Sequence, residues 1–146
     1  MQLDEMLELV FSIDGEERME FARRQFEIVS EELEKLGVDE QNKGAMLLEM
    51  VKLFVRADHH TSYEEYSFLT ELFDAHVSFQ EFRRKIHTRH PENFEEIIET
   101  IVKSFSYEGR VAFCYFGLCL LESDENMSSE EKALMERVIK ADLGEN

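Results

Sequence analysis

The sequence is poor in the residues that make tight turns. It contains one proline and six glycines in 146 residues, whereas a protein built from β-hairpins needs such residues at many positions. The residues between them are rich in leucine, glutamate, methionine, lysine and alanine, which are strong helix formers. The sequence therefore predicts an all-α protein.

Basic residues are also scarce. The chain has 16 lysines and arginines against 33 aspartates and glutamates, which gives a net charge of −17 with neutral histidines. Binding to duplex nucleic acid requires clustered basic residues that neutralise phosphates, and a negative field also repels anionic membrane surfaces. The charge argues against nucleic acid as a partner and favours cations or basic proteins.

No apolar run is long enough to cross a membrane. The longest, 111–121, is bounded by Arg110 and Glu122 and is far shorter than the ~20 residues that a spanning helix requires. We expect it to be a buried central helix. Residues 1–11 carry acidic side chains where a signal peptide has basic ones. We therefore expect no membrane span and a cytoplasmic location.

The familiar catalytic motifs are missing. The sequence has no glycine-rich phosphate loop, no HExxH zinc motif, no Glu-x-x-His signature and no nucleophile elbow. Cys114 and Cys119 lie five residues apart in the apolar run, so on a helix they point about 140° apart and cannot form a disulfide. Burial raises the pKa of a thiol and makes it inert. We expect reduced, packed thiols and a non-enzymatic protein.

The sequence does contain enough apolar surface for one domain. Hydrophobic residues make up 43% of the chain and include 12 phenylalanines. Their spacing predicts a compact bundle of seven or eight helices. The expected helices are a short opening helix, a long one between Asp14 and a cap at Gly37, one at about 41–57, one after a break at 58–61, and others at 78–86, after Pro91, at 111–121 and at 129–140. We expect a single domain, 1–146, with N-terminal helices in 1–38 and a duplicated core in 39–146.

Two of the expected helices have distinct apolar faces. The face of the long helix comprises Ala22, Phe26, Val29, Leu33 and Leu36. The face of the next helix comprises Leu47, Leu48, Val51, Phe54 and Val55. Both faces are expected to pack into the core.

The most informative feature is a short segment that occurs twice, 66 residues apart. Positions 58–65 read DHHTSYEE and positions 124–131 read DENMSSEE, so one Asp, one Ser and two Glu coincide. An apolar helix is expected before each copy and an amphipathic helix after it. The sequence thus predicts an internal two-fold repeat of a helix, an acidic turn and a second helix.

Helix capping explains part of the repeated motif. Ser62 with Glu65, and Ser128 with Glu131, match the S-x-x-E capping box, which satisfies backbone N–H groups at the start of a helix. In this explanation each acidic turn is a clasp between two helices, and its aspartate accepts hydrogen bonds from turn amides.

The repeated aspartate also favours a metal site. Asp58 and Asp124 follow the end of an apolar helix, where the helix dipole disfavours negative charge. A divalent cation bound by oxygen ligands would relieve the repulsion between the carboxylates. The pattern does not distinguish calcium, manganese and zinc, and both copies lack the glycine and final glutamate of the EF-hand loop. The candidate ligands are Asp58, Glu64, Glu65, Asp124, Glu130 and Glu131.

The motif resembles that of the TerB-like tellurite-resistance domains. The resemblance is carried by FVRAD at 54–58 and EEY at 64–66, is echoed over 120–132, and covers roughly residues 40–142. TerB-like domains are compact, all-helical bacterial proteins associated with resistance to tellurite and other stress. Their acidic positions are proposed to bind divalent cations, and no catalytic activity is established for them. The resemblance implies a non-enzymatic, stress-related cation-binding protein, although the family commonly has glycine directly after the aspartate, where this chain has His59 and Glu125.

Two further groups of residues leave alternatives open. His59 and His60 lie beside Asp58 and are either additional metal ligands or exposed turn histidines. A basic segment comprises Arg83, Arg84, Lys85, His87, Arg89 and His90. It is either a solvated helix end or a docking site for an acidic partner. The alternative to cation binding is thus an adaptor that recruits an unknown partner protein, with the acidic turns acting only as structural caps.

Overall fold

The computed structural model describes residues 2–55, 62–73, 76–87, 93–122 and 127–144. Over these residues the chain forms eight α-helices and no strand, which confirms the predicted all-α bundle. The helices are α1 (Leu3–Phe11), α2 (Gly15–Lys35), α3 (Glu40–Val55), α4 (Tyr63–Phe73), α5 (Phe79–Ile86), α6 (Phe94–Lys103), α7 (Tyr107–Leu121) and α8 (Ser129–Leu143).

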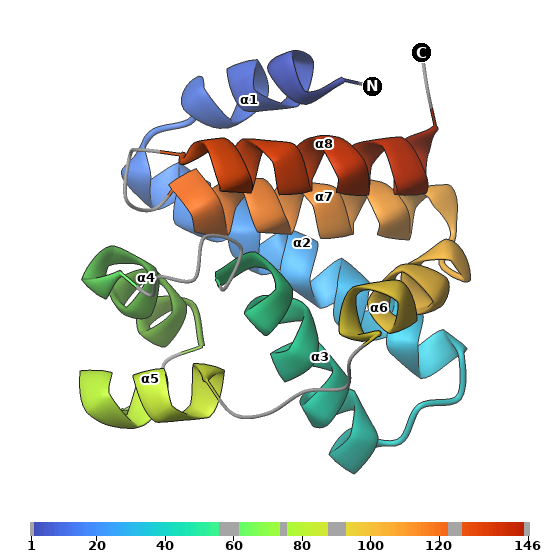
Figure 1. The fold of residues 1–146 in the computed structure, drawn as a ribbon, viewed down its shortest axis with the longest axis horizontal. Helices are drawn as coiled ribbons and strands as arrows, with labels where there is room; N and C mark the ends of the chain where they lie inside the picture. The colour runs from blue at the N-terminus through green and yellow to red at the C-terminus, as the bar shows by residue number, and fades with distance from the viewer. Residues whose placement is uncertain (1, 56–61, 74–75, 88–92, 123–126, 145–146) are drawn as a thin grey trace.

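Helix α7 is the centre of the fold. It packs mainly against α2 and α8, and α1, α3, α4 and α6 also contact it (Figure 1). All residues of 112–121 are buried, as a helix that is apolar on every side requires. The prediction of a buried central helix is therefore confirmed. No helix in the described part of the chain combines the length and the apolar character needed to cross a membrane.

Gly117 allows α3 to approach α7 closely. A Cβ atom at this position would lie 2.4 Å from Cε1 of the Phe54 ring, which is too close for any real side chain. The Phe54 ring also contacts Phe113, with ring centroids 5.1 Å apart. The missing side chain at position 117 therefore leaves room for an aromatic ring in the middle of the core.

Local sequence signals define both ends of α2, as predicted. The carboxylate of Asp14 accepts the backbone N–H of Glu17 and caps the first turn. At the other end Gly37 has a φ of 85°, and the N–H of Val38 donates to the carbonyl of Leu33 at 3.2 Å. This arrangement is a Schellman motif, in which glycine adopts the left-handed conformation without steric cost.

Two leucines that were expected on apolar faces are instead exposed. Leu36 is 46% exposed and Leu48 is 39% exposed. Leu36 is the C-cap of α2, so the helix has already ended there and the side chain leaves the apolar face. Leu48 lies at the edge of a groove beside α3. The other members of the two faces are buried or half-buried.

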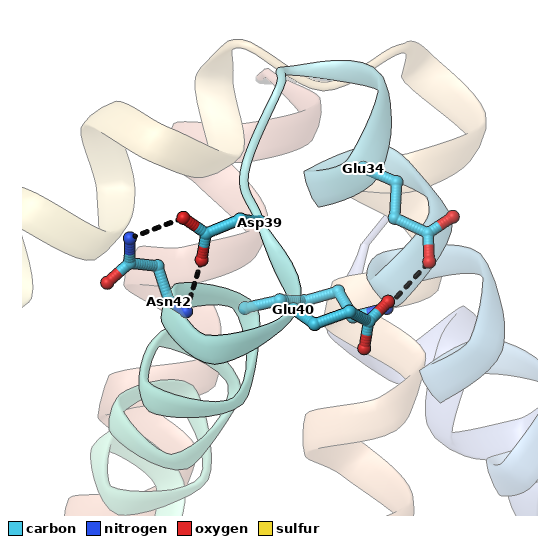
Figure 2. Close-up of polar contacts among 5 residues, drawn as sticks. Glu34, Asp39, Glu40 and Asn42 are labelled. Carbon is cyan, nitrogen blue, oxygen red and sulfur yellow. Dashed lines mark hydrogen bonds and ion pairs between the residues drawn. The ribbon is translucent and has the colours of Figure 1, made fainter.

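A polar cluster fixes the turn between α2 and α3 (Figure 2). The carboxylate of Asp39 accepts the backbone N–H and the side-chain amide of Asn42, at 2.9 and 3.2 Å, and so caps α3. Lys43 donates to Glu34 of α2 at 2.6 Å and to Glu40 at 2.9 Å. These two hydrogen bonds raise the pKa of Lys43. The cluster therefore ties the end of one helix to the first turn of the next.

The two predicted copies of the repeat have different surroundings. Helix α8 lies along α7 and runs in the opposite direction (Figure 1). Helix α4, by contrast, packs mainly against α2, α7 and α5. The helices after the two acidic turns thus pack differently, and the duplicated core over 39–146 stays a prediction.

Candidate functional site

The predicted site lies at the connections between α3 and α4 and between α7 and α8. Asp58 and Asp124, together with His59 and His60, lie outside the described residues. The described candidates lie in the first turns of α4 and α8 and are Glu64, Glu65, Glu130 and Glu131.

In the first acidic turn, Ser62 and Glu65 form the predicted capping box. Oε1 of Glu65 accepts the backbone N–H of Ser62 at 2.9 Å and its hydroxyl at 3.2 Å. The hydroxyl oxygen of Ser62 accepts the backbone N–H of Glu65 at 3.0 Å. Glu65 is only 2% exposed. The carboxylate is thus buried and bonded to the start of α4.

The second acidic turn repeats this geometry at Ser128 and Glu131. Oε1 of Glu131 accepts the N–H of Ser128 at 2.8 Å, and the hydroxyl oxygen of Ser128 accepts the N–H of Glu131 at 3.1 Å. Glu131 is also 2% exposed, whereas Glu64 and Glu130 are exposed. In each copy the second glutamate therefore caps a helix from a buried position, and the first glutamate is accessible to solvent.

A buried glutamate beside the second turn was not among the predicted ligands. Glu122 is the C-cap of α7 and is 4% exposed. With Glu131 it places a buried carboxylate on each side of 123–126, the segment that contains Asp124. A carboxylate at the C-terminal end of a helix opposes the helix dipole. The sequence did offer a sign of this residue, because Glu122 is the acidic residue that directly follows the apolar run 111–121. The first copy of the repeat has Arg56 at the matching position.

The atoms of the two acidic turns that could ligate a metal ion are carboxylate oxygens. Calcium and manganese prefer such ligands, and zinc accepts them. Within the described ranges, no three His, Cys, Asp or Glu side chains form a group that could hold a metal ion. The six predicted ligands include two that these ranges do not contain, Asp58 and Asp124.

The basic segment lies on the surface of α5. Arg83 places its guanidinium 5.7 Å from the centroid of the Phe79 ring, and Arg84 lies 3.8 Å from the carboxylate of Glu81. Cations in the last turn of a helix also interact favourably with its dipole. The described basic residues are exposed and comprise Arg83, Arg84, Lys85 and His87, while Arg89 and His90 lie outside the described residues.

Both cysteines are free and buried, as predicted. Burial raises the pKa of Cys119 to about 12. Burial, with the nearby charge of Asp142, raises the pKa of Cys114 well above its usual value. A thiol that keeps its proton at neutral pH is a poor nucleophile.

Asp142 is a buried acid that sequence reasoning did not single out. It lies in the last turn of α8, is 2% exposed, and places Oδ2 3.9 Å from Sγ of Cys114. Burial, followed by repulsion from Glu99, raises its pKa to about 7, although Lys103 and Arg110 act in the opposite direction. Its apolar neighbours in the sequence gave no sign of this position, which depends on how α8 packs on α7.

Comparison with models of protein families, with curated proteins and with solved structures finds no significant match to this chain. The resemblance to TerB-like domains stays a prediction that rests on the repeated motif.

Proposed function

We propose that this protein is a non-enzymatic, cytoplasmic binding protein that takes up a divalent cation at its acidic turns, in the stress-related class that the TerB-like motif implies. One observation carries the proposal. Glu122 and Glu131 are two buried carboxylates that flank the turn containing Asp124. Carboxylate oxygens are the ligands that hard divalent cations prefer in proteins.

The second turn is the stronger of the two candidate sites. At the position of Glu122, the first turn carries Arg56, whose positive charge disfavours a cation. Both turns share the aspartate, the exposed glutamate and the buried capping glutamate. We therefore expect one tighter site that depends on Asp124 and weaker binding that depends on Asp58.

Isothermal titration of chelator-treated protein with calcium, manganese and zinc tests the proposal. Moderate salt is needed because a net charge of −17 attracts cations without a site. We expect saturable binding at the tighter site, which Asp124→Asn abolishes and Asp58→Asn leaves largely intact. The matched control is Glu136→Gln, which removes one exposed charge from α8. If the Asp58→Asn, Asp124→Asn double variant binds cations as the parent does, the turns are not the site.

An adaptor is the second candidate function. It is favoured by the capping role of Glu65 and Glu131, which shows these side chains stabilising helix starts, and by the exposed basic surface of α5. This function predicts binding of an acidic ligand. Its test is the anisotropy of a fluorescent acidic peptide, which should bind the parent and not the Arg83→Glu, Arg84→Glu variant.

A further inference from the structure

An apolar groove opens between α3, α4 and α5. Its volume is about 310 Å³, which is within the range of specific binding pockets. The groove is lined by residues of α3, α4, α5 and α2, among them Leu47, Val51, Leu69, Ile86 and Phe26. The groove is thus built by side chains of four helices.

The walls of the groove end in exposed apolar side chains. Leu48 of α3 is 39% exposed and Phe73 of α4 is 41% exposed, and both line the groove. Large apolar side chains that gather around a concave surface mark an interaction site more often than scattered ones do. The lining of the groove is apolar apart from Thr70 and Lys85.

The charge at the groove is opposite to that of the molecule. Among the described lining residues, Lys85 carries the only charge. The exposed surface of α5 also carries Arg83 and Arg84, against the single carboxylate of Glu81, which lies 3.8 Å from Arg84. The whole chain has a net charge of −17. This local positive charge favours a ligand with acidic groups beside its apolar surface.

Aromatic side chains extend the surface from the groove across α4 and α5. Phe82 lines the groove and contacts Tyr66, with ring centroids 5.3 Å apart. Tyr66 contacts Phe79 at 5.3 Å, and Tyr63 contacts Phe79 at 5.6 Å. Tyrosine and arginine are enriched where binding energy concentrates in protein interfaces, and here Arg83 stacks on Phe79.

We infer that this groove is the docking site for an acidic amphipathic helix of a partner protein. A trough between helices accommodates the apolar stripe of another helix, whose anchors recur at i, i+3 or i+4, and i+7. Acidic side chains along the edge of that stripe would meet Lys85 and Arg84. The inference rests on the adaptor function and is independent of cation binding.

The test uses a fluorescent helical peptide of about 15 residues with a leucine stripe flanked by glutamates. One control peptide has the same composition in an order that breaks the stripe, and a second has lysine in place of glutamate. Anisotropy is measured with the full chain at moderate salt. We expect the acidic striped peptide to bind at least about tenfold more tightly than either control, which corresponds to a difference in binding free energy of about 1.4 kcal/mol.

Gly44→Leu blocks the groove without damaging the fold. Gly44 lies in α3 and lines the groove, and a Cβ atom there meets nothing within 4 Å. Leucine is also a better helix former than glycine. Gly15→Leu is the matched control, since Gly15 has equally open surroundings outside the groove. Lys85→Glu tests the sign of the charge.

We expect Gly44→Leu to weaken binding of the striped peptide at least about tenfold and Gly15→Leu to leave it unchanged. Lys85→Glu should weaken the acidic peptide and strengthen the lysine peptide. Binding that Gly44→Leu does not affect but Arg83→Glu, Arg84→Glu abolishes would overturn the groove and leave the adaptor function in place. Saturable binding of dodecanoate, a fatty acid, would show that the groove is a pocket for a small apolar ligand and would overturn the inference. Self-association that Gly44→Leu abolishes would show that a second copy of the chain occupies the groove, and would also overturn it.

Discussion

The carboxylate of Glu32 in α2 accepts the backbone N–H of Ser106, the N-cap of α7, across 74 residues of sequence. Glu32 is 5% exposed and also accepts a hydrogen bond from Lys35 at 3.3 Å. A Cβ atom at Gly109 would lie 2.4 Å from Oε1 of Glu32. The carboxylate thus reaches the first turn of the central helix through a space that only glycine leaves open.

We predict that Glu32→Gln lowers the free energy of unfolding by about 1–1.5 kcal/mol at pH 7, because a neutral amide oxygen replaces a charged hydrogen-bond acceptor at a buried site. Burial raises the pKa of Glu32, but the hydrogen bonds from Ser106 and Lys35 outweigh it and lower the pKa below 4.5. This stabilisation is therefore present above pH 4.5 and is lost as the pH falls through the folded-state pKa.

Urea unfolding at neutral and acidic pH checks this prediction. The difference between the parent and Glu32→Gln should be largest at pH 7 and should shrink at low pH. Glu31→Gln is the control, because Glu31 is the exposed neighbour. Equal stability of the parent and Glu32→Gln at pH 7 would contradict the prediction.

Asp142→Asn should stabilise the protein above neutral pH. The pKa of Asp142 is raised from 3.8 to about 7, so the folded state holds a proton that the unfolded state has released. Between these values stability falls as the pH rises. Asparagine does not ionise, so the variant should gain about 2–4 kcal/mol over the parent at pH 8 and little at pH 4. Chemical unfolding at several pH values measures this difference, and parallel pH profiles for the two proteins would exclude it.

Gly117→Ala should destabilise the fold by about 1–3 kcal/mol, because its methyl group would collide with the Phe54 ring. Gly44→Ala is a matched control and should stabilise α3 by about 0.5–1 kcal/mol, since its Cβ has open space. Thermal unfolding compares the two variants. In the double variant Gly117→Ala, Phe54→Leu, the smaller side chain should recover part of the loss that Gly117→Ala causes. A Gly117→Ala protein as stable as the parent would show that the ring can move aside.

Ser128→Ala separates capping from cation binding. Loss of the hydroxyl that accepts the N–H of Glu131 should cost about 1 kcal/mol. Cation binding at the second turn should persist, because Ser128 is not among the proposed ligands. Ser129→Ala is the control, since this serine is exposed beside the cap. A titration in which Ser128→Ala abolishes binding while the protein remains folded would make the cap itself part of the site.

Features set by neighbouring residues could be predicted from the sequence. The cap at Asp14, the Schellman glycine Gly37 and the two Ser-x-x-Glu boxes depend on contacts over a few residues, so a short pattern contains what is needed. The buried helix α7 was predictable because its apolar run is long and uninterrupted. The all-α fold followed from these local signals.

Features set by packing between distant helices could not be predicted. The burial of Glu32 and Asp142 depends on where α7 lies relative to α2 and α8, and charged residues give no periodic sign of such a position. The groove was missed because Leu48 has the spacing of a core residue, whereas its side chain is 39% exposed and lines the groove. The candidate cation site was predictable only as a repeated motif. Glu122 became a candidate residue only when the structure showed that it is buried at the end of α7.

The order of the helices along the chain has a consequence during synthesis. Helix α2 packs mainly on α7, and the carboxylate of Glu32 in α2 accepts the backbone N–H of Ser106, 74 residues later. At about 5–20 residues per second, the ribosome makes this stretch in about 4–15 s. During that time the apolar face of α2 has left the ribosome without its partner. We therefore expect the nascent chain to expose most of this face until α7 emerges.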